Sequence, residues 1–134
     1  REWGGVVADS LADEDPAAPT VDRIVGDVVG TVRRLRENEL FVRIVELDPE
    51  LLLPYLLSRR GRSQDAILGL IARAVADGQA EGAVRRGNPL AIARALLLAA
   101  HGFVLSAHTM VDDEVSEDEL DAELVHLLTR SLQP

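Results

Sequence analysis

Three ionisable side chains stand seven residues apart in a segment that is otherwise uncharged. Arg94, His101 and His108 lie between Pro89 and Val111, and no other residue of that segment carries a charge. On a helix, a seven-residue repeat keeps such side chains on one face, with a drift of about 20° per repeat. A histidine on that face could exchange a hydrogen bond with a ligand and could titrate near neutral pH.

The two histidines do not form a metal site by themselves. At about 1.5 Å rise per residue they stand about 10 Å apart along a helix axis, too far to share one zinc ion. Two interpretations of His101 stay open: it is either a polar contact for a ligand among apolar walls, or a histidine whose hydrogen bonds are satisfied at a dimer interface or at the end of the bundle. We favour the second, because buried polar groups usually find partners within the protein. We expect Arg94 to pair with a carboxylate of another helix and His108 to be partly exposed.

The other charged clusters do not assemble a catalytic or metal site. Eight of the 23 acidic residues lie between Asp112 and Glu123 without the spacing of an EF-hand, which indicates a turn and the start of a helix. The arginine-rich stretch 59–62 has no interleaved aromatic residues, which favours a solvated turn over a phosphate site. The chain has no cysteine, and no nucleophile elbow, metal triad or Gly-rich phosphate loop stands out. We therefore expect no enzymatic activity, no metal and no cofactor.

The composition of the chain limits its fold class and the kinds of partner it can bind. Of 134 residues, 47% are hydrophobic but only 3% are aromatic, so the core must consist of Leu, Val, Ile and Ala, at spacings that favour helices. The net charge of -9 argues against this chain holding DNA by itself. The longest apolar run is interrupted by Arg94, His101 and Gly102, which makes it a poor membrane span. With no signal peptide recognised, we expect a cytoplasmic protein without a membrane partner.

Hydrophobic periodicity predicts an all-α fold, a helical bundle. The apolar stripes predict helices over residues 20–37, 39–47, 51–57, 63–82 and 89–111, and a last helix from about 116 to 132. The expected N-caps are Thr20, Asp48, Ser63, Asn88 and Ser116. Residues 3–14 could form a short helix, and the Pro-rich, acidic stretch after them indicates a linker.

The predicted helix over 89–111 is apolar on every face and so needs cover on every side. We expect it to be an antiparallel neighbour of the last helix, and two copies of this hairpin would form a four-helix dimer interface. The residues expected at that interface are Leu96, Ala99, Ala100, Phe103, Ala107, Leu120, Leu124, Leu127 and Leu128.

Several short motifs, in their order and spacing, resemble the regulatory domain of TetR-type transcriptional repressors. They are Thr20-Val21-Asp22, Arg34 to Asn38 followed by Leu40-Phe41, Glu46 to Leu52, Gly78 to Arg85, Asn88-Pro89 and Ala93 to Phe103. The resemblance covers roughly residues 6–132. It implies a homodimer formed by the last two helices, a small-molecule pocket among the preceding helices, and operator binding by a separate N-terminal helix-turn-helix domain.

That three-helix DNA-binding domain is missing from the sequence, and Arg1 falls about where the linking helix would begin. The resemblance thus implies the start of a linking helix and a linker over 1–19 and a regulatory domain over 20–134. DNA would be bound only through the absent domain, which agrees with the acidic charge of this chain. Truncation, removal or disorder of the domain, and a sensor that never carried one, are all compatible with the sequence.

The resemblance implies an effector pocket, and the effector is expected to be small and apolar. The residues expected to line the pocket are Trp3, Val32, Leu35, Phe41, Tyr55, Ile71 and His101. Most of these lie on helical stripes that ordinarily face a core, so a purely structural role competes with ligand contact. The alternative function is a helical dimerisation adaptor that binds no small molecule. A thermal-shift screen separates the two, because a ligand that binds the native state raises its stability.

Overall fold

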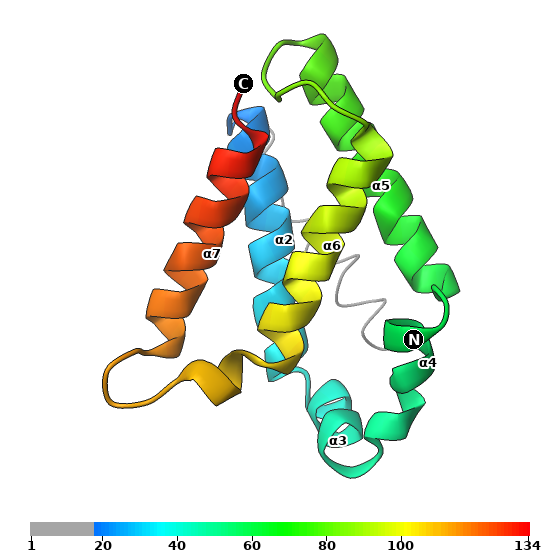
Figure 1. Ribbon diagram of the computed structural model, residues 1–134, viewed down its shortest axis with the longest axis vertical. Coiled ribbons are helices and arrows are strands. Elements are labelled where there is room, and N and C mark those ends of the chain that lie inside the picture. Colours follow the sequence, from blue (N-terminus) through cyan, green and yellow to red (C-terminus); the bar gives the residue numbers. More distant parts are fainter. Residues whose placement is uncertain (1–17) are drawn as a thin grey trace.

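A computed structural model describes residues 18–134, and every regular element in that range is helical. Residues 3–14 and Trp3 lie outside the described residues. Six α-helices follow one another: α2 (Thr20–Glu37), α3 (Glu39–Leu47), α4 (Leu53–Leu57), α5 (Arg62–Ala80), α6 (Pro89–Leu105) and α7 (Glu117–Leu132) (Figure 1). Two 3-10 turns, η1 (Pro49–Leu51) and η2 (Ala107–Met110), join them. The predicted all-α class is confirmed for this part of the chain.

Helix α2 is the central element of the core. Its valines and isoleucine recur at three- and four-residue steps, and the six residues of this stripe are buried: Val21, Ile24, Val25, Val28, Val29 and Val32. Helices α5, α6 and α7 all pack against α2, and α5 also packs along α6. One hydrophobic cluster therefore runs through all four long helices, with Val75 of α5, Leu96 of α6 and Leu124 of α7 among its most buried members.

Side-chain caps fix several of the helix boundaries. The Asn88 side chain accepts a hydrogen bond from the Leu90 amide, and Ser116 and Glu119 form the predicted capping box at the start of α7. Two expected caps are wrong. Thr20 is the first residue of α2, with Pro19 before it. Helix α5 begins at Arg62 with Gly61 as its N-cap, two residues before the expected Ser63 cap, and the Gly61 amide donates a hydrogen bond to the Gln64 side chain.

Helices α6 and α7 run antiparallel, as predicted, but they are not packed directly against each other over their length. Both lie on α2, which shows between them in Figure 1. We expected α6 and α7 to pack against each other, and this is corrected: each of them packs against α2 instead.

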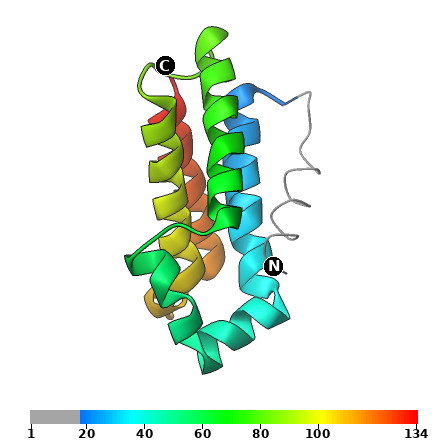
Figure 2. The ribbon, with the colours of Figure 1, turned by 90° about the vertical axis from the view of Figure 1, so that its right-hand side faces the viewer.

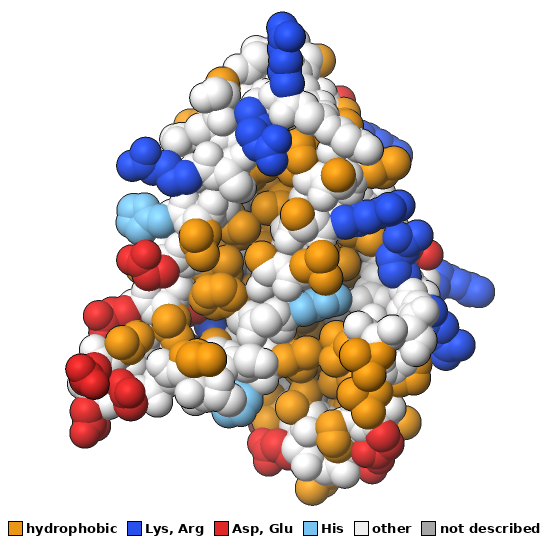
Figure 3. Space-filling model, viewed as in Figure 1, with side chains coloured by type: hydrophobic (Ala, Val, Ile, Leu, Met, Phe, Trp, Pro, Cys, Tyr) orange, Lys and Arg blue, Asp and Glu red, His pale blue; other side chains and the backbone are white. Residues whose placement is uncertain are grey.

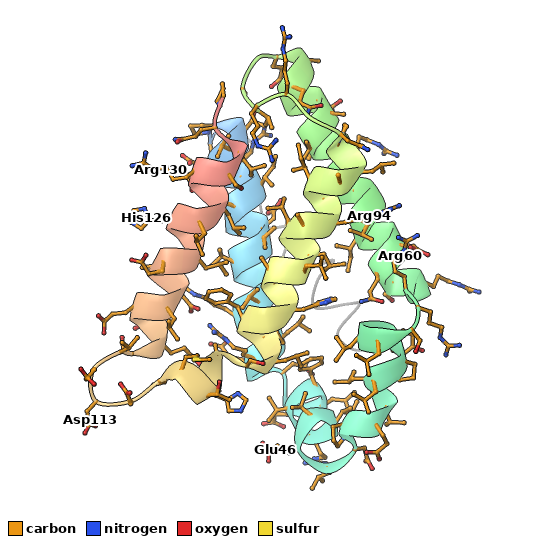
Figure 4. All side chains as sticks on the ribbon, viewed as in Figure 1. Glu46, Arg60, Arg94, Asp113, His126 and Arg130 are labelled. Atoms are coloured by element: carbon orange, nitrogen blue, oxygen red, sulfur yellow. The ribbon has the colours of Figure 1, made fainter. Side chains whose placement is uncertain are left out.

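Helix α6 is shorter than the apolar segment suggested. It ends at Leu105, and the chain turns at Ser106 into η2, which contains His108. His108 therefore does not continue the helical face that carries Arg94 and His101, and the predicted three-residue stripe is wrong. Arg94 is exposed and projects from the outside of α6 (Figure 4), and no ion pair of Arg94 occurs within residues 18–134.

The segment from α3 through η1 to α4 crosses the lower end of the long helices. Figure 2 shows it below α2 and α5, turned across their direction. Asn38 interrupts the helix between α2 and α3, and its side chain accepts a hydrogen bond from the Phe41 amide. The buried Phe41 of α3 lies beneath the bundle. None of the described helices is both long and apolar enough to cross a bilayer.

Candidate functional site

A cavity of about 360 Å³ lies where α2, α3, α4, α5 and α6 converge. Its volume falls within the range of small-molecule pockets. Most of its lining is aliphatic or aromatic, and the polar side chains are few. The lining residues are Thr31, Val32, Leu35, Phe41, Leu52, Tyr55, Leu56, Gly61, Arg62, Ser63, Gln64, Ile67, Leu97, Ala100, His101, Val104 and Leu105.

Helix periodicity explains how the two long walls are built. On α6, positions 97, 101 and 104 recur at four- and three-residue steps and form the flank beside the buried stripe of Ala93, Leu96 and Ala100. On α2, Thr31 and Leu35 stand one helical turn apart. The short α4 adds Tyr55 and Leu56. Helices α2 and α6 thus each have one stripe in the common core and an adjacent flank on the cavity.

The polar centre of the cavity is a pair of side chains from α5 and α6. Nε2 of Gln64 lies 3.4 Å from Nε2 of His101, and Oε1 of Gln64 accepts a hydrogen bond from the Gly61 amide at 2.8 Å. Burial lowers the pKa of His101 below its usual value of 6.5, so the imidazole is neutral at neutral pH. The cavity therefore offers uncharged hydrogen-bonding groups among apolar walls.

Few of the described residues that line the cavity are charged. Within residues 18–134, no acidic side chain lines it, and the one charged lining residue, Arg62, is exposed. Nearby, Nε of Arg60 lies 2.8 Å from Oδ1 of Asp65, and the Arg59 guanidinium lies 5.5 Å from the centroid of the Tyr55 ring. The arginine-rich stretch is thus an exposed turn beside the cavity, as the sequence indicated.

Five of the seven residues predicted to line a pocket do line this cavity: Val32, Leu35, Phe41, Tyr55 and His101. Ile71 does not, because it lies in the hydrophobic core. Trp3 falls outside the described residues. Sequence reasoning missed Gln64, which sits in the first turn of α5 and was hidden by the assumption that Ser63 caps that helix. The ligand role of these residues stays a prediction.

A second candidate site is the face formed by α6 and α7. Figure 3 shows hydrophobic side chains gathered between and over these helices, with charged side chains toward the edges. On α6 the exposed positions Ala91, Ala95, Leu98 and Gly102 repeat at helical spacing, and Leu98 is 70% exposed. On α7, Leu127 is 61% exposed. We call this surface, Ala91, Ala95, Leu98, Gly102 and Leu127, the α6–α7 face.

The residues predicted at a dimer interface divide into two groups. Leu96, Ala100, Ala107, Leu124 and Leu128 are buried within the chain itself, so the expectation that their side chains contact a partner is corrected: they fill the core. Ala99, Phe103 and Leu120 are half-buried, and Leu127 is exposed. His126 and Arg130 project from the edge of α7 that points away from α6 (Figure 4), which leaves the α6–α7 face free of them.

A buried ion pair ties α7 to α2, and the sequence analysis did not find it. Oδ2 of Asp121 lies 2.6 Å from Nη2 of Arg36 and 3.1 Å from Nε of Arg33, with the Asp121 side chain only 2% exposed. Burial alone would raise the pKa of Asp121, but hydrogen bonds and charge from Arg36 and Arg33 outweigh it and hold the pKa below its usual value. The spacing of Asp121 could have indicated its burial, because Asp121 lies on the same helical stripe as the apolar residues Leu124, Leu128 and Leu132.

Comparison with known proteins identifies transcriptional regulators as relatives. The chain is 29% identical over 122 residues to an uncharacterized HTH-type transcriptional regulator of Mycobacterium tuberculosis, an alignment that covers 91% of this chain and 63% of that protein. It is 30% identical over 107 residues to one of Mycobacterium bovis, with 80% of this chain and 55% of that protein covered. The chain therefore spans less than two thirds of the length of these relatives. No protein-family profile matches the chain, and no solved structure matches it.

Proposed function

We propose that this chain is the effector-binding and dimerisation domain of a TetR-like transcriptional repressor. The observation that carries the proposal is the cavity of about 360 Å³ among α2 to α6, in a chain that is similar to HTH-type regulators over most of its length. Apolar walls with a few uncharged polar groups suit a small, mainly apolar effector. Operator DNA would be bound by an N-terminal helix-turn-helix domain, since this chain has a net charge of -9.

Helix α2 would connect effector binding to the DNA-binding domains. Thr31, Val32 and Leu35 line the cavity on one side of α2, while Arg33 and Arg36 bind Asp121 of α7 on another. An effector that binds one arrangement of α2 and α7 more tightly than another shifts the population toward it. In a dimer built on the α6–α7 face, that shift changes the separation of the two DNA-binding domains and weakens operator binding.

Ligand binding is tested by thermal shift against a library of apolar small molecules. We expect some compounds to raise the Tm of the wild type, because binding to the native state stabilises it. Val104→Trp, at a half-buried position on the cavity wall, should abolish the shift by filling the space. The matched control is Leu70→Trp on α5, where the side chain is 50% exposed and does not line the cavity. A Tm that no compound changes would favour the dimerisation adaptor.

A further inference from the structure

The orientation of the Gln64 amide is fixed by a group that can only donate. The Gly61 backbone N–H, at the start of α5, gives its hydrogen to a Gln64 side-chain atom at 2.8 Å. That atom must therefore be the carbonyl oxygen, Oε1, because an amide nitrogen carries hydrogens and cannot accept. The NH2 group of Gln64 consequently points the other way, toward His101, whose Nε2 lies 3.4 Å from it.

This orientation determines which nitrogen of His101 carries the proton. An NH2 group donates, so Nε2 of His101 must accept and must be unprotonated. In a neutral imidazole one nitrogen is protonated, and here it is Nδ1. At many functional sites, the hydrogen bond made by one ring nitrogen of a histidine sets the protonation of the other nitrogen in this way. Gln64 is therefore a positioning residue, and Nδ1–H of His101 is a donor.

That donor has no acceptor among the described residues. Within residues 18–134, the interaction with Gln64 is the one hydrogen bond of the His101 ring. His101 is half-buried and lines the cavity, whose other walls are mainly aliphatic. A ligand that fills the cavity displaces water from this region, and an N–H left without an acceptor then costs free energy.

We propose that the cavity selects an uncharged, mainly apolar molecule with an oxygen acceptor, such as a ketone or ester, which receives a hydrogen bond from Nδ1–H of His101. The inference rests on the proposed function, because it specifies the ligand of that cavity. A lipophilic cation is disfavoured, since none of the described residues that line the cavity is a carboxylate that could offset the cost of desolvating its charge. A pure hydrocarbon is disfavoured because it leaves Nδ1–H unsatisfied.

The tautomer is tested without any ligand. Nitrogen-15 NMR of the histidine rings at about pH 8.5, where His101 is neutral, should show a protonated Nδ1 and an unprotonated Nε2. Gln64→Glu keeps an acceptor for the Gly61 amide but places a second oxygen beside the ring, so it should move the proton to Nε2. A wild-type ring already protonated on Nε2, or a tautomer that Gln64→Glu leaves unchanged, would overturn the inference.

Ligand selection is tested with two probes of the same shape, benzophenone and diphenylmethane, which differ by a carbonyl in place of a methylene. We expect calorimetry to find benzophenone bound about three- to tenfold more tightly by the wild type, the usual worth of one neutral hydrogen bond. The preference should vanish in Gln64→Glu and in His101→Leu. Equal affinity in the wild type contradicts this inference alone and leaves the cavity a ligand site. If neither probe binds, both this inference and the proposed function are contradicted for molecules of this size.

Discussion

Asp121 is the residue on which the attachment of α7 depends most. Its carboxylate is buried and bonded to Arg36, whose own side chain is only 12% exposed. Replacing one member of a buried pair leaves the other charge without compensation. We expect Asp121→Asn to lower the free energy of unfolding by about 3 kcal/mol, measured by urea denaturation. Glu117→Gln is the control: Glu117 is 52% exposed and 3.8 Å from Arg36, and its loss should cost less than about 1 kcal/mol.

The same residue predicts a dependence of stability on pH. Because the pKa of Asp121 is lower in the folded chain than its usual value of 3.8, the folded state holds the ionised form more strongly than the unfolded chain does. That stabilisation is complete above pH 3.8 and is lost as the pH falls through the folded pKa. The difference in unfolding free energy between wild type and Asp121→Asn should therefore be constant near neutrality and shrink below pH 3.8. A difference that grows on acidification would contradict the assignment.

His101 predicts a second pH effect with a different cause. Burial disfavours its charged form, so the pKa in the folded chain lies below the usual 6.5. Below pH 6.5 the unfolded chain binds a proton that the folded chain does not yet bind, and stability is lost as the pH falls through the folded pKa. We expect the unfolding free energy of the wild type to fall more steeply below pH 6.5 than that of His101→Gln. Parallel curves for the two proteins would show that burial has not moved this pKa.

At the scale of elements, the turn after α5 depends on a glycine. A Cβ built on Gly78 would lie 2.5 Å from Cγ2 of Val84 and 3.0 Å from Cγ2 of Thr20, and the Ala83 and Val84 amides both donate to the Gly78 carbonyl. Gly78→Ala should therefore cost about 1 to 3 kcal/mol by overpacking, measured by urea denaturation. Gly69→Ala on the same helix meets nothing within 4 Å and should instead stabilise by up to about 1 kcal/mol. Equal effects of both changes would contradict the packing at Gly78.

The sequence predicted the helices well because each carries its own periodic stripe and local caps. It placed α2, α3 and α7 correctly within a residue or two, and Val32, Leu35 and Phe41 on the eventual cavity. Hydrophobicity alone could not predict the end of α6, because the apolar residues continue past Leu105 into η2.

Contacts between residues that are far apart in the sequence could not be predicted from local sequence patterns. Leu96 and Leu127 look alike in sequence, yet one fills the core and the other is 61% exposed. Which of the two leucines is buried depends on how α6 and α7 pack against α2, and the local sequence does not show that packing. For the same reason the pairs Gln64–His101 and Arg36–Asp121 were missed, since their members are 37 and 85 residues apart.

At the scale of the whole molecule, the prediction concerns the dimer. Leu98 on α6 is 70% exposed and Leu127 on α7 is 61% exposed, and both belong to the α6–α7 face. A partner chain would remove these leucines from water, whereas an arginine at either position would bring a charge into the interface. We expect the wild type to sediment as a dimer, and Leu98→Arg and Leu127→Arg to sediment as folded monomers at the same concentration.

The control residue must be as hydrophobic and as exposed as Leu98 and Leu127 but lie elsewhere on the molecule. Leu57 of α4 is 78% exposed and is not part of the α6–α7 face, so Leu57→Arg should leave the dimer intact. Leu124→Arg would not serve, because Leu124 is fully buried and a charge there would unfold the chain. Circular dichroism of each variant separates dissociation from unfolding. If Leu98→Arg and Leu127→Arg remain dimeric while Leu57→Arg becomes monomeric, the chains associate through the α3–α4 side, and the coupling through α2 and α7 that we propose for an effector would be contradicted.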